Sequence, residues 1–201
     1  MFLQSQLKAL LRDGSQGAER HDARNLQRSW RKFAGFAYVA EQYGYEYDGL
    51  SPLSPKGSPN PYFAFRRTLD AVERATRTTE RYPTALQGGQ LPGMRPGGNR
   101  LRPLAETRRD VDLLHARIMV DSSRTHRRRG LVMLLIIPFV MLIPLSQTGF
   151  TSTALLVCAA VWLLFATLWG LGLYLARRRL TKYGGILTAA GIDWPPTRVR
   201  T

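Results

Sequence analysis

The chain has 201 residues and a formal net charge of +15, from 29 Lys and Arg against 14 Asp and Glu. A single cysteine excludes a disulfide framework, and three scattered histidines exclude most His/Cys metal sites. The length allows one ordinary domain, or a small domain with a membrane anchor. The composition is strongly divided, because residues 131–176 contain no Asp, Glu, Lys, Arg or His, whereas residues 1–130 contain 23 basic and 13 acidic side chains.

The first residues, MFLQSQLKALLRDG, are basic and amphipathic. They lack the long apolar core and the small-residue cleavage site of a signal peptide. A mitochondrial presequence, a helix lying on a membrane surface and an ordinary first helix of the fold all stay open.

Residues 1–103 are predicted to form a basic peripheral region of helices with long irregular connections. Apolar spacing predicts a helix over residues 18–43, followed by a short extended segment at 45–48. A second helix is predicted over 62–81, because Pro61 suits a helix start and Phe65, Leu69, Val72 and Thr76 follow at helical spacing. The Pro- and Gly-rich stretches 48–61 and 87–103 are predicted to be loops.

Residues 104–130 are predicted to form a juxtamembrane helix that runs toward the membrane, with Val111, Leu114 and Ile118 on one stripe. Three helices with so few large apolar residues are expected to bury too little surface for a compact autonomous domain. A partner protein is therefore expected to order this part of the chain.

The uncharged stretch 131–176 is predicted to be a transmembrane hairpin. Residues 131–150 and 154–176 are each long enough, at 1.5 Å per residue, to cross about 30 Å of hydrocarbon. The connection between them is short, so the spans must be antiparallel neighbours. The predicted fold class is therefore an all-α membrane protein, a two-helix hairpin preceded by a basic helical region.

Basic residues flank both predicted spans on one side, which places both termini on the positive-inside side of the membrane. That side is the matrix if the membrane is the mitochondrial inner membrane, and the cytoplasm if it is bacterial. Residues 177–201 form a basic C-terminal tail. The flanking residues are Arg127, Arg128, Arg129, Arg177, Arg178, Arg179 and Lys182.

Two further groups of residues in and after the second span have predicted roles, one in packing against another helix and one in anchoring at the membrane interface. Small residues four apart allow close approach of another helix, and Trp or Tyr near a span end anchors it at the interface. The small pairs are Ala166 with Gly170 and Gly172 with Ala176, and the predicted interfacial anchors are Trp169, Tyr174 and Trp194.

No constellation of residues predicts catalysis. Gly93 to Gly98 has the spacing of a phosphate loop, but Asn99-Arg100 follows where Lys-Ser/Thr is needed. Asp110, Asp112 and His115 lie within one and a half helical turns without a second cluster to complete a metal site. We therefore expect no enzyme activity, no metal and no cofactor apart from bound anionic lipid.

The sequence favours a non-catalytic accessory subunit that anchors and stabilises a larger membrane protein complex. The setting predicted first is an energy-transducing complex of the mitochondrial inner membrane, such as a respiratory complex or ATP synthase. Its expected partners are the other subunits and anionic phospholipids; nucleic acid is disfavoured because the basic residues are scattered. The alternative is a pore-forming or membrane-tethering hairpin of a bacterial or phage system, with nucleic acid bound by the basic N-terminal region.

Overall fold

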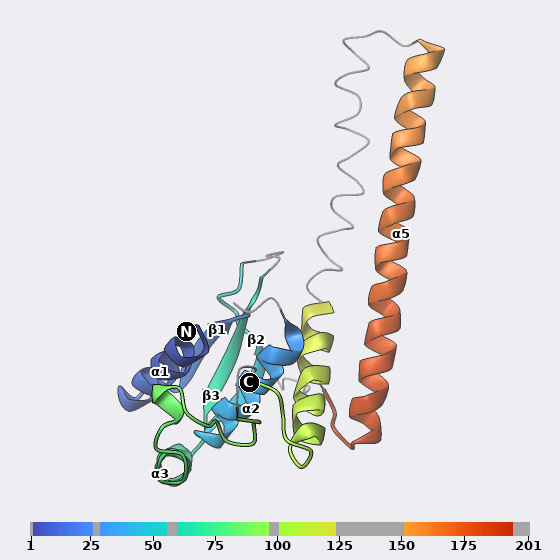
Figure 1. The fold of residues 1–201 in the computed structure, drawn as a ribbon. Helices are drawn as coiled ribbons and strands as arrows, with labels where there is room; N and C mark the ends of the chain where they lie inside the picture. The colour runs from blue at the N-terminus through green and yellow to red at the C-terminus, as the bar shows by residue number, and fades with distance from the viewer. Residues whose placement is uncertain (1, 26–28, 56–59, 97–100, 124–150, 195–201) are drawn as a thin grey trace, which may run out of the picture.

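The computed structural model describes residues 2–25, 29–55, 60–96, 101–123 and 151–194 (Figure 1). These residues form a mixed α/β fold with a three-stranded antiparallel sheet. The predicted all-α two-helix hairpin is therefore wrong. Among the described residues there is one helix long and apolar enough to cross a membrane. The first predicted span, residues 131–150, lies outside the described residues.

The sheet is built from β1 (Arg20–Arg24), β2 (Tyr45–Leu50) and β3 (Tyr62–Arg67), in the order β1-β3-β2. β3 lies in the centre and pairs antiparallel with both neighbours. The register pairs Arg24 with Tyr62 and Leu50 with Phe63, so these residues share one end of the sheet. A bulge in β2 falls between Tyr47 and Gly49.

The predicted helix over 62–81 is wrong in its first half, which is strand β3. Phe63 and Phe65 are fully buried in this strand. The residues that suggested helical spacing beyond them are exposed, with Leu69 at 109% and Val72 at 65% of their reference areas. The second half is α3 (Ala71–Arg81), an almost wholly exposed helix.

The predicted helix over 18–43 is likewise two elements. Residues 20–24 form β1, and α2 (Trp30–Gln42) begins only after Ser29, whose side chain accepts a bond from the backbone N–H of Lys32. A hydroxyl at this position satisfies one of the free N–H groups of a helix start. The extended segment predicted near residue 45 is confirmed as β2.

The core lies between α2 and the sheet and is rich in aromatic rings. Phe33 and Phe36 of α2 contact Phe63 and Phe65 of β3 with ring centroids 5.0 to 6.2 Å apart. Leu7 and Leu10 of α1 (Phe2–Ser15) join the same buried cluster. The prediction that this region buries too little for a compact core is therefore wrong.

The turn between α2 and β2 depends on a glycine. Gly44 has φ of +84°, a conformation that costs an L-residue roughly 1–2 kcal/mol. A Cβ at this position would lie 2.3 Å from the Cα of Ala71, so α3 starts directly against the turn. No larger residue fits there without moving one of the two segments.

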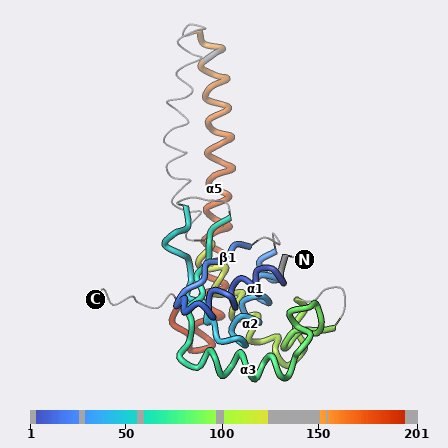
Figure 2. Tube along the Cα trace, turned by 90° about the vertical axis from the view of Figure 1, so that its left-hand side faces the viewer, coloured from blue at the N-terminus to red at the C-terminus, as the bar shows by residue number. Residues whose placement is uncertain are grey.

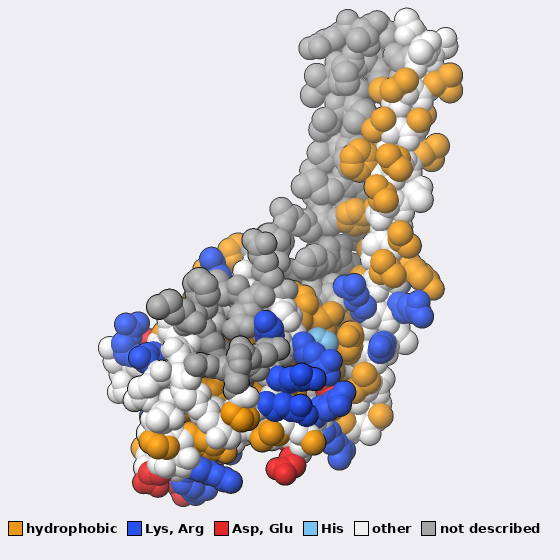
Figure 3. Space-filling model, in the orientation of Figure 1, with side chains coloured by type: hydrophobic (Ala, Val, Ile, Leu, Met, Phe, Trp, Pro, Cys, Tyr) orange, Lys and Arg blue, Asp and Glu red, His pale blue; other side chains and the backbone are white. Residues whose placement is uncertain are grey.

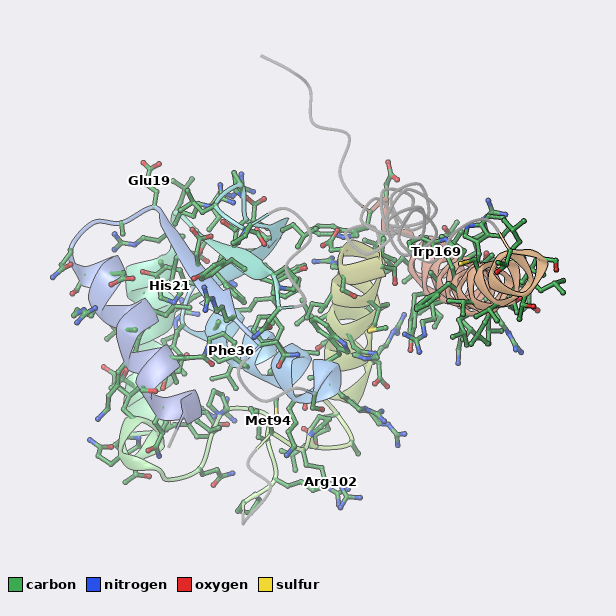
Figure 4. The ribbon with its side chains drawn as sticks, turned by 90° about the horizontal axis from the view of Figure 1, so that it is seen from above. Glu19, His21, Phe36, Met94, Arg102 and Trp169 are labelled. Carbon is green, nitrogen blue, oxygen red and sulfur yellow. The ribbon has the colours of Figure 1, made fainter. Side chains whose placement is uncertain are left out.

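Residues 108–123 are helical, and we call this segment helix 108–123. It packs on the core through Val111, Leu114 and Ile118, the stripe that the sequence predicts. The segment before it, from η1 (Ala85–Gln87) to residue 104, contributes Leu91, Met94 and Leu101 to the core. Seen from above in Figure 4, helix 108–123 lies between the sheet and the last helix, α5 (Ser152–Ala189).

Candidate membrane anchor and its junction with the folded domain

The helix α5 is the candidate membrane anchor. Its 38 residues give a length of about 57 Å at 1.5 Å per residue. It is one continuous helix that extends away from the domain (Figures 1 and 2). The mean hydropathy of its apolar part is 2.1, and none of that part is buried within the protein. Most of its large apolar side chains are at least 40% exposed, among them Leu156, Leu163, Leu164, Phe165 and Leu168. Length and composition therefore fit a membrane span.

The small residues predicted to pack against another helix lie on different faces of α5. Ala166 and Ala176 are partly buried, whereas Gly170 and Gly172 are exposed. A Cβ added to either glycine would meet nothing within 4 Å. Both glycines are therefore open to a second helix, and helix packing at them stays a prediction.

The three predicted interfacial anchors occupy different surroundings. Trp169 is partly buried and Tyr174 is 61% exposed, both on the apolar part of α5. Trp194 lies beyond the helix end and stacks on Tyr47 of β2, with ring centroids 5.7 Å apart. Trp194 therefore packs against the folded domain.

The predicted basic flank continues the same helix. Arg177, Arg178, Arg179 and Lys182 are all exposed, and blue side chains lie along the visible face of the lower part of α5 in Figure 3. The basic residues predicted to flank the first span, Arg127, Arg128 and Arg129, lie outside the described residues. Residues 177–189 of the predicted basic C-terminal tail are helical, because α5 runs on without interruption to Ala189.

Beyond the basic flank, α5 is joined to the domain by an apolar contact. Leu187 is 2% exposed and packs with Ala116 and Val120 of helix 108–123. Tyr183 lies about one turn before Leu187 and Leu180 about two turns before it, on the same side of α5, and both pack against this cluster. The last three turns of α5 are therefore held by the domain, while the preceding turns extend away from it.

A buried polar network closes the junction after the helix ends. The Asp121 carboxylate, 5% exposed, accepts bonds from the Tyr47 hydroxyl at 2.8 Å and from the Trp194 indole N–H at 3.2 Å. Burial, and then the Asp121 charge, raise the pKa of Tyr47 well above 10, so its hydroxyl keeps its proton. Asp121 thus links β2, helix 108–123 and the segment after α5.

Charged side chains surround this network. The guanidinium of Arg117 lies 5.2 Å from the Trp194 ring centroid. Burial raises the pKa of Glu41 from 4.5 to about 7, while Arg117 opposes that shift and Glu46 adds to it. Glu41 therefore changes charge near neutral pH at the end of α2, close to the junction.

Replacing Glu41 with glutamine is expected to change the pH dependence of stability. The folded state binds the Glu41 proton more tightly than the unfolded chain, so ionising it costs stability as pH rises from 4.5 to about 7. Glutamine removes that loss. The free energy of unfolding of the variant, relative to that of the native protein, should therefore rise between pH 5 and pH 8. Urea midpoints measured across this range check the result, and parallel curves for the two proteins would contradict it.

Other polar residues of the domain form ordinary structural contacts. Asp112 pairs with Arg31 at 3.0 Å and with Arg108 at 3.8 Å, and His21 contacts Asp13 at 2.7 Å. The carbonyl of Gly93 accepts bonds from the Thr107 hydroxyl and the Leu104 N–H, so it serves the fold rather than a phosphate. Within the described ranges no group of three or more His, Cys, Asp or Glu could hold a metal ion.

The sequence reasoning missed the junction residues Glu41, Tyr47, Arg117 and Asp121. They come from three separate elements, and Tyr47 and Asp121 are 74 residues apart. One signal was available, because Asp121 follows Ile118 and Val120 on the apolar side of its helix, where an acid needs a partner. No family model matches this chain, and no curated protein and no solved structure is detectably similar to it.

Proposed function

We propose that this protein is a non-catalytic, membrane-anchored accessory subunit of a larger membrane complex. In this proposal α5 is the anchor, and the α/β domain is held at the membrane surface to bind other subunits. The observation that supports it most is the continuity of α5, which passes unbroken from an apolar stretch with no buried residue into a contact buried by the domain. A domain tied in this way has its position and direction set by the membrane.

The basic residues support one orientation of this arrangement. Arg177, Arg178, Arg179 and Lys182 lie between the apolar stretch and the domain, where the positive-inside rule favours the cytoplasmic or matrix side. The domain and the C-terminal residues then lie on that side. An energy-transducing complex of the mitochondrial inner membrane stays our predicted setting, with a bacterial membrane as the alternative.

The native mass after gentle detergent extraction tests this proposal. Mass spectrometry of the co-migrating proteins identifies the partners. We expect a defined assembly several times heavier than the 22.7 kDa chain. Migration as a monomer would contradict the accessory role, and migration as a homo-oligomer would favour the pore-forming alternative.

Gly170→Leu is expected to weaken that assembly without changing the fold. A Cβ at Gly170 meets no atom of the described residues within 4 Å, so the effect of a larger side chain reports on a neighbouring helix. The fraction of protein that migrates in the large assembly measures the effect. Gly185→Leu is the matched control, because Gly185 is equally open but lies beyond the basic flank. If both variants migrate like the native protein, the predicted helix packing at Gly170 is refuted.

A further inference from the structure

The described part of the connection between β2 and β3, residues 51–55 and 60–61, lies at the end of the sheet toward which the apolar part of α5 extends. In Figure 1 it rises higher than α2 and helix 108–123, on the side toward which α5 extends. Figure 2, turned by 90° about the vertical axis, shows the same arrangement. Since α5 is fixed to the domain by Leu187 and the Trp194 contacts, this end of the sheet would face a membrane crossed by α5.

An apolar side chain stands at this end in an ordered turn. Leu53 is 77% exposed, and its neighbours Pro52 and Pro55 are exposed as well. The turn is tied to the sheet, because the N–H of Ser51 donates to the Tyr62 carbonyl at 3.0 Å and the N–H of Tyr62 donates to the Ser54 hydroxyl at 3.0 Å. The buried Ser51 hydroxyl accepts the Leu53 N–H at 3.1 Å. Leu53 is thus held outward by the fold.

The residues around this turn have the composition of a membrane interface. Tyr62 is partly buried, and the guanidinium of the exposed Arg24 lies 4.0 Å from its ring centroid. Trp30, also partly buried, meets the edge of Phe63 at the same end of the sheet. Trp and Tyr are enriched at the headgroup level of membranes, where an Arg beside them can meet anionic lipid.

Acidic side chains at the opposite end of the sheet lie beside basic ones. In Figure 3 the largest red groups lie at the bottom of the molecule, away from the apolar part of α5. α3, at that end in Figures 1 and 2, carries Glu73 and Glu80 and follows Asp70; Asp70 pairs with Arg74 and Glu73 with Arg77. The described residues of the β2–β3 connection, 51–55 and 60–61, contain no acid. These described turn residues therefore carry no negative charge that would repel an anionic lipid surface at the Leu53 end.

We propose that residues 51–55, after β2, are a second membrane contact, in which Leu53 enters the headgroup region and Tyr62 and Arg24 lie at its surface. This inference rests on the proposed anchoring by α5, because α5 sets the distance and direction of the bilayer. The partner is the lipid itself. Two contacts, one through the span and one through the turn, fix the tilt of the domain on the membrane.

Three single-cysteine forms of the full chain test the proposal in vesicles of phosphatidylcholine and phosphatidylglycerol. The first keeps the native Cys158 on α5; the others carry Cys158→Ala with either Leu53→Cys or Leu69→Cys. Leu69 is the matched control, since it is an exposed leucine at the opposite end of the sheet. Each thiol receives an environment-sensitive fluorophore, and lipids with a nitroxide at the headgroup or deep in the chain act as quenchers.

The label at position 53 is expected to lose about half of its emission to the headgroup quencher, as a side chain at the interface would. The label at 69 should be unaffected, and the label at 158 should respond to the deep quencher. If labels 53 and 69 behave alike while 158 is quenched, the second contact is refuted and the anchor stands. If 158 is not quenched either, both proposals fall.

Discussion

Asp121→Ala is expected to lower the free energy of unfolding by about 3 kcal/mol, because a buried and a partly buried donor lose their acceptor together. The Tyr47 hydroxyl and the Trp194 indole N–H both donate to this carboxylate, which is 5% exposed. Tyr47 is 1% exposed, so water cannot replace the lost acceptor without opening the junction. Urea unfolding of the full chain in mild detergent, followed by tryptophan fluorescence, measures the loss.

Asp112→Ala is the matched control, because Asp112 lies on the same helix and pairs with Arg31 and Arg108 at the surface. Exposed ion pairs contribute about 1 kcal/mol or less, so this variant should stay close to the native protein. The difference between the two alanine variants isolates the buried network from any general effect on helix 108–123. Equal losses in both would refute the structural role assigned to Asp121.

Phe65→Ala is expected to cost about 3–5 kcal/mol, the range for removing a buried aromatic ring. Phe65 is fully buried in the central strand, and its ring contacts Phe33, Phe36 and Tyr47 at centroid distances of 5.6 to 6.2 Å. A loss of this size is a large share of the stability of a small domain, so the variant should be partly unfolded at 37 °C. Circular dichroism during thermal unfolding checks the shift in Tm.

Leu69→Ala provides the contrast, because Leu69 is fully exposed after the end of β3. Its loss should change stability by less than about 0.5 kcal/mol. The two alanine variants also distinguish a strand from a helix in the segment 62–81. A helix with Phe65 and Leu69 on one buried face would be destabilised by both substitutions, whereas the strand β3 is destabilised only by the loss of Phe65. Phe65→Leu should recover part of the lost stability, which would identify packing as the cause.

The sequence reasoning found the long apolar helix because that signal is local. A run of apolar residues followed by Arg177, Arg178 and Arg179 can be recognised without knowing any contact. The stripe of Val111, Leu114 and Ile118 was equally local, and the structure buries all three.

The sheet could not be predicted in the same way. β1, with the sequence RHDAR, has Ala23 as its one apolar residue and becomes a strand only by pairing with β3. In β3, Phe63 and Phe65 alternate as a strand requires, but Phe65 and Leu69 are also four residues apart. A short apolar run fits both periods, and the long-range pairing of β3 with both neighbours decided the outcome.

The junction lay further beyond the reach of local patterns. Trp194 follows a basic helix, and its position alone suits an interfacial anchor. Its partners Tyr47 and Asp121 are 147 and 73 residues away in the chain, so only the folded arrangement brings them together. The helical course of residues 177–189 was missed because charges end a transmembrane prediction without ending a helix.

The unbroken course of α5 from residue 152 to residue 189 also sets a rotational phase between the lipid-facing part and the domain. Each residue of an α-helix turns the chain by about 100°, so the azimuth of the domain around the helix axis is fixed by residue count. A single residue inserted between Lys182 and the apolar stretch would swing the sheet about 100° around that axis. Seven inserted residues, nearly two full turns, would restore the original azimuth and lift the domain by about 10 Å.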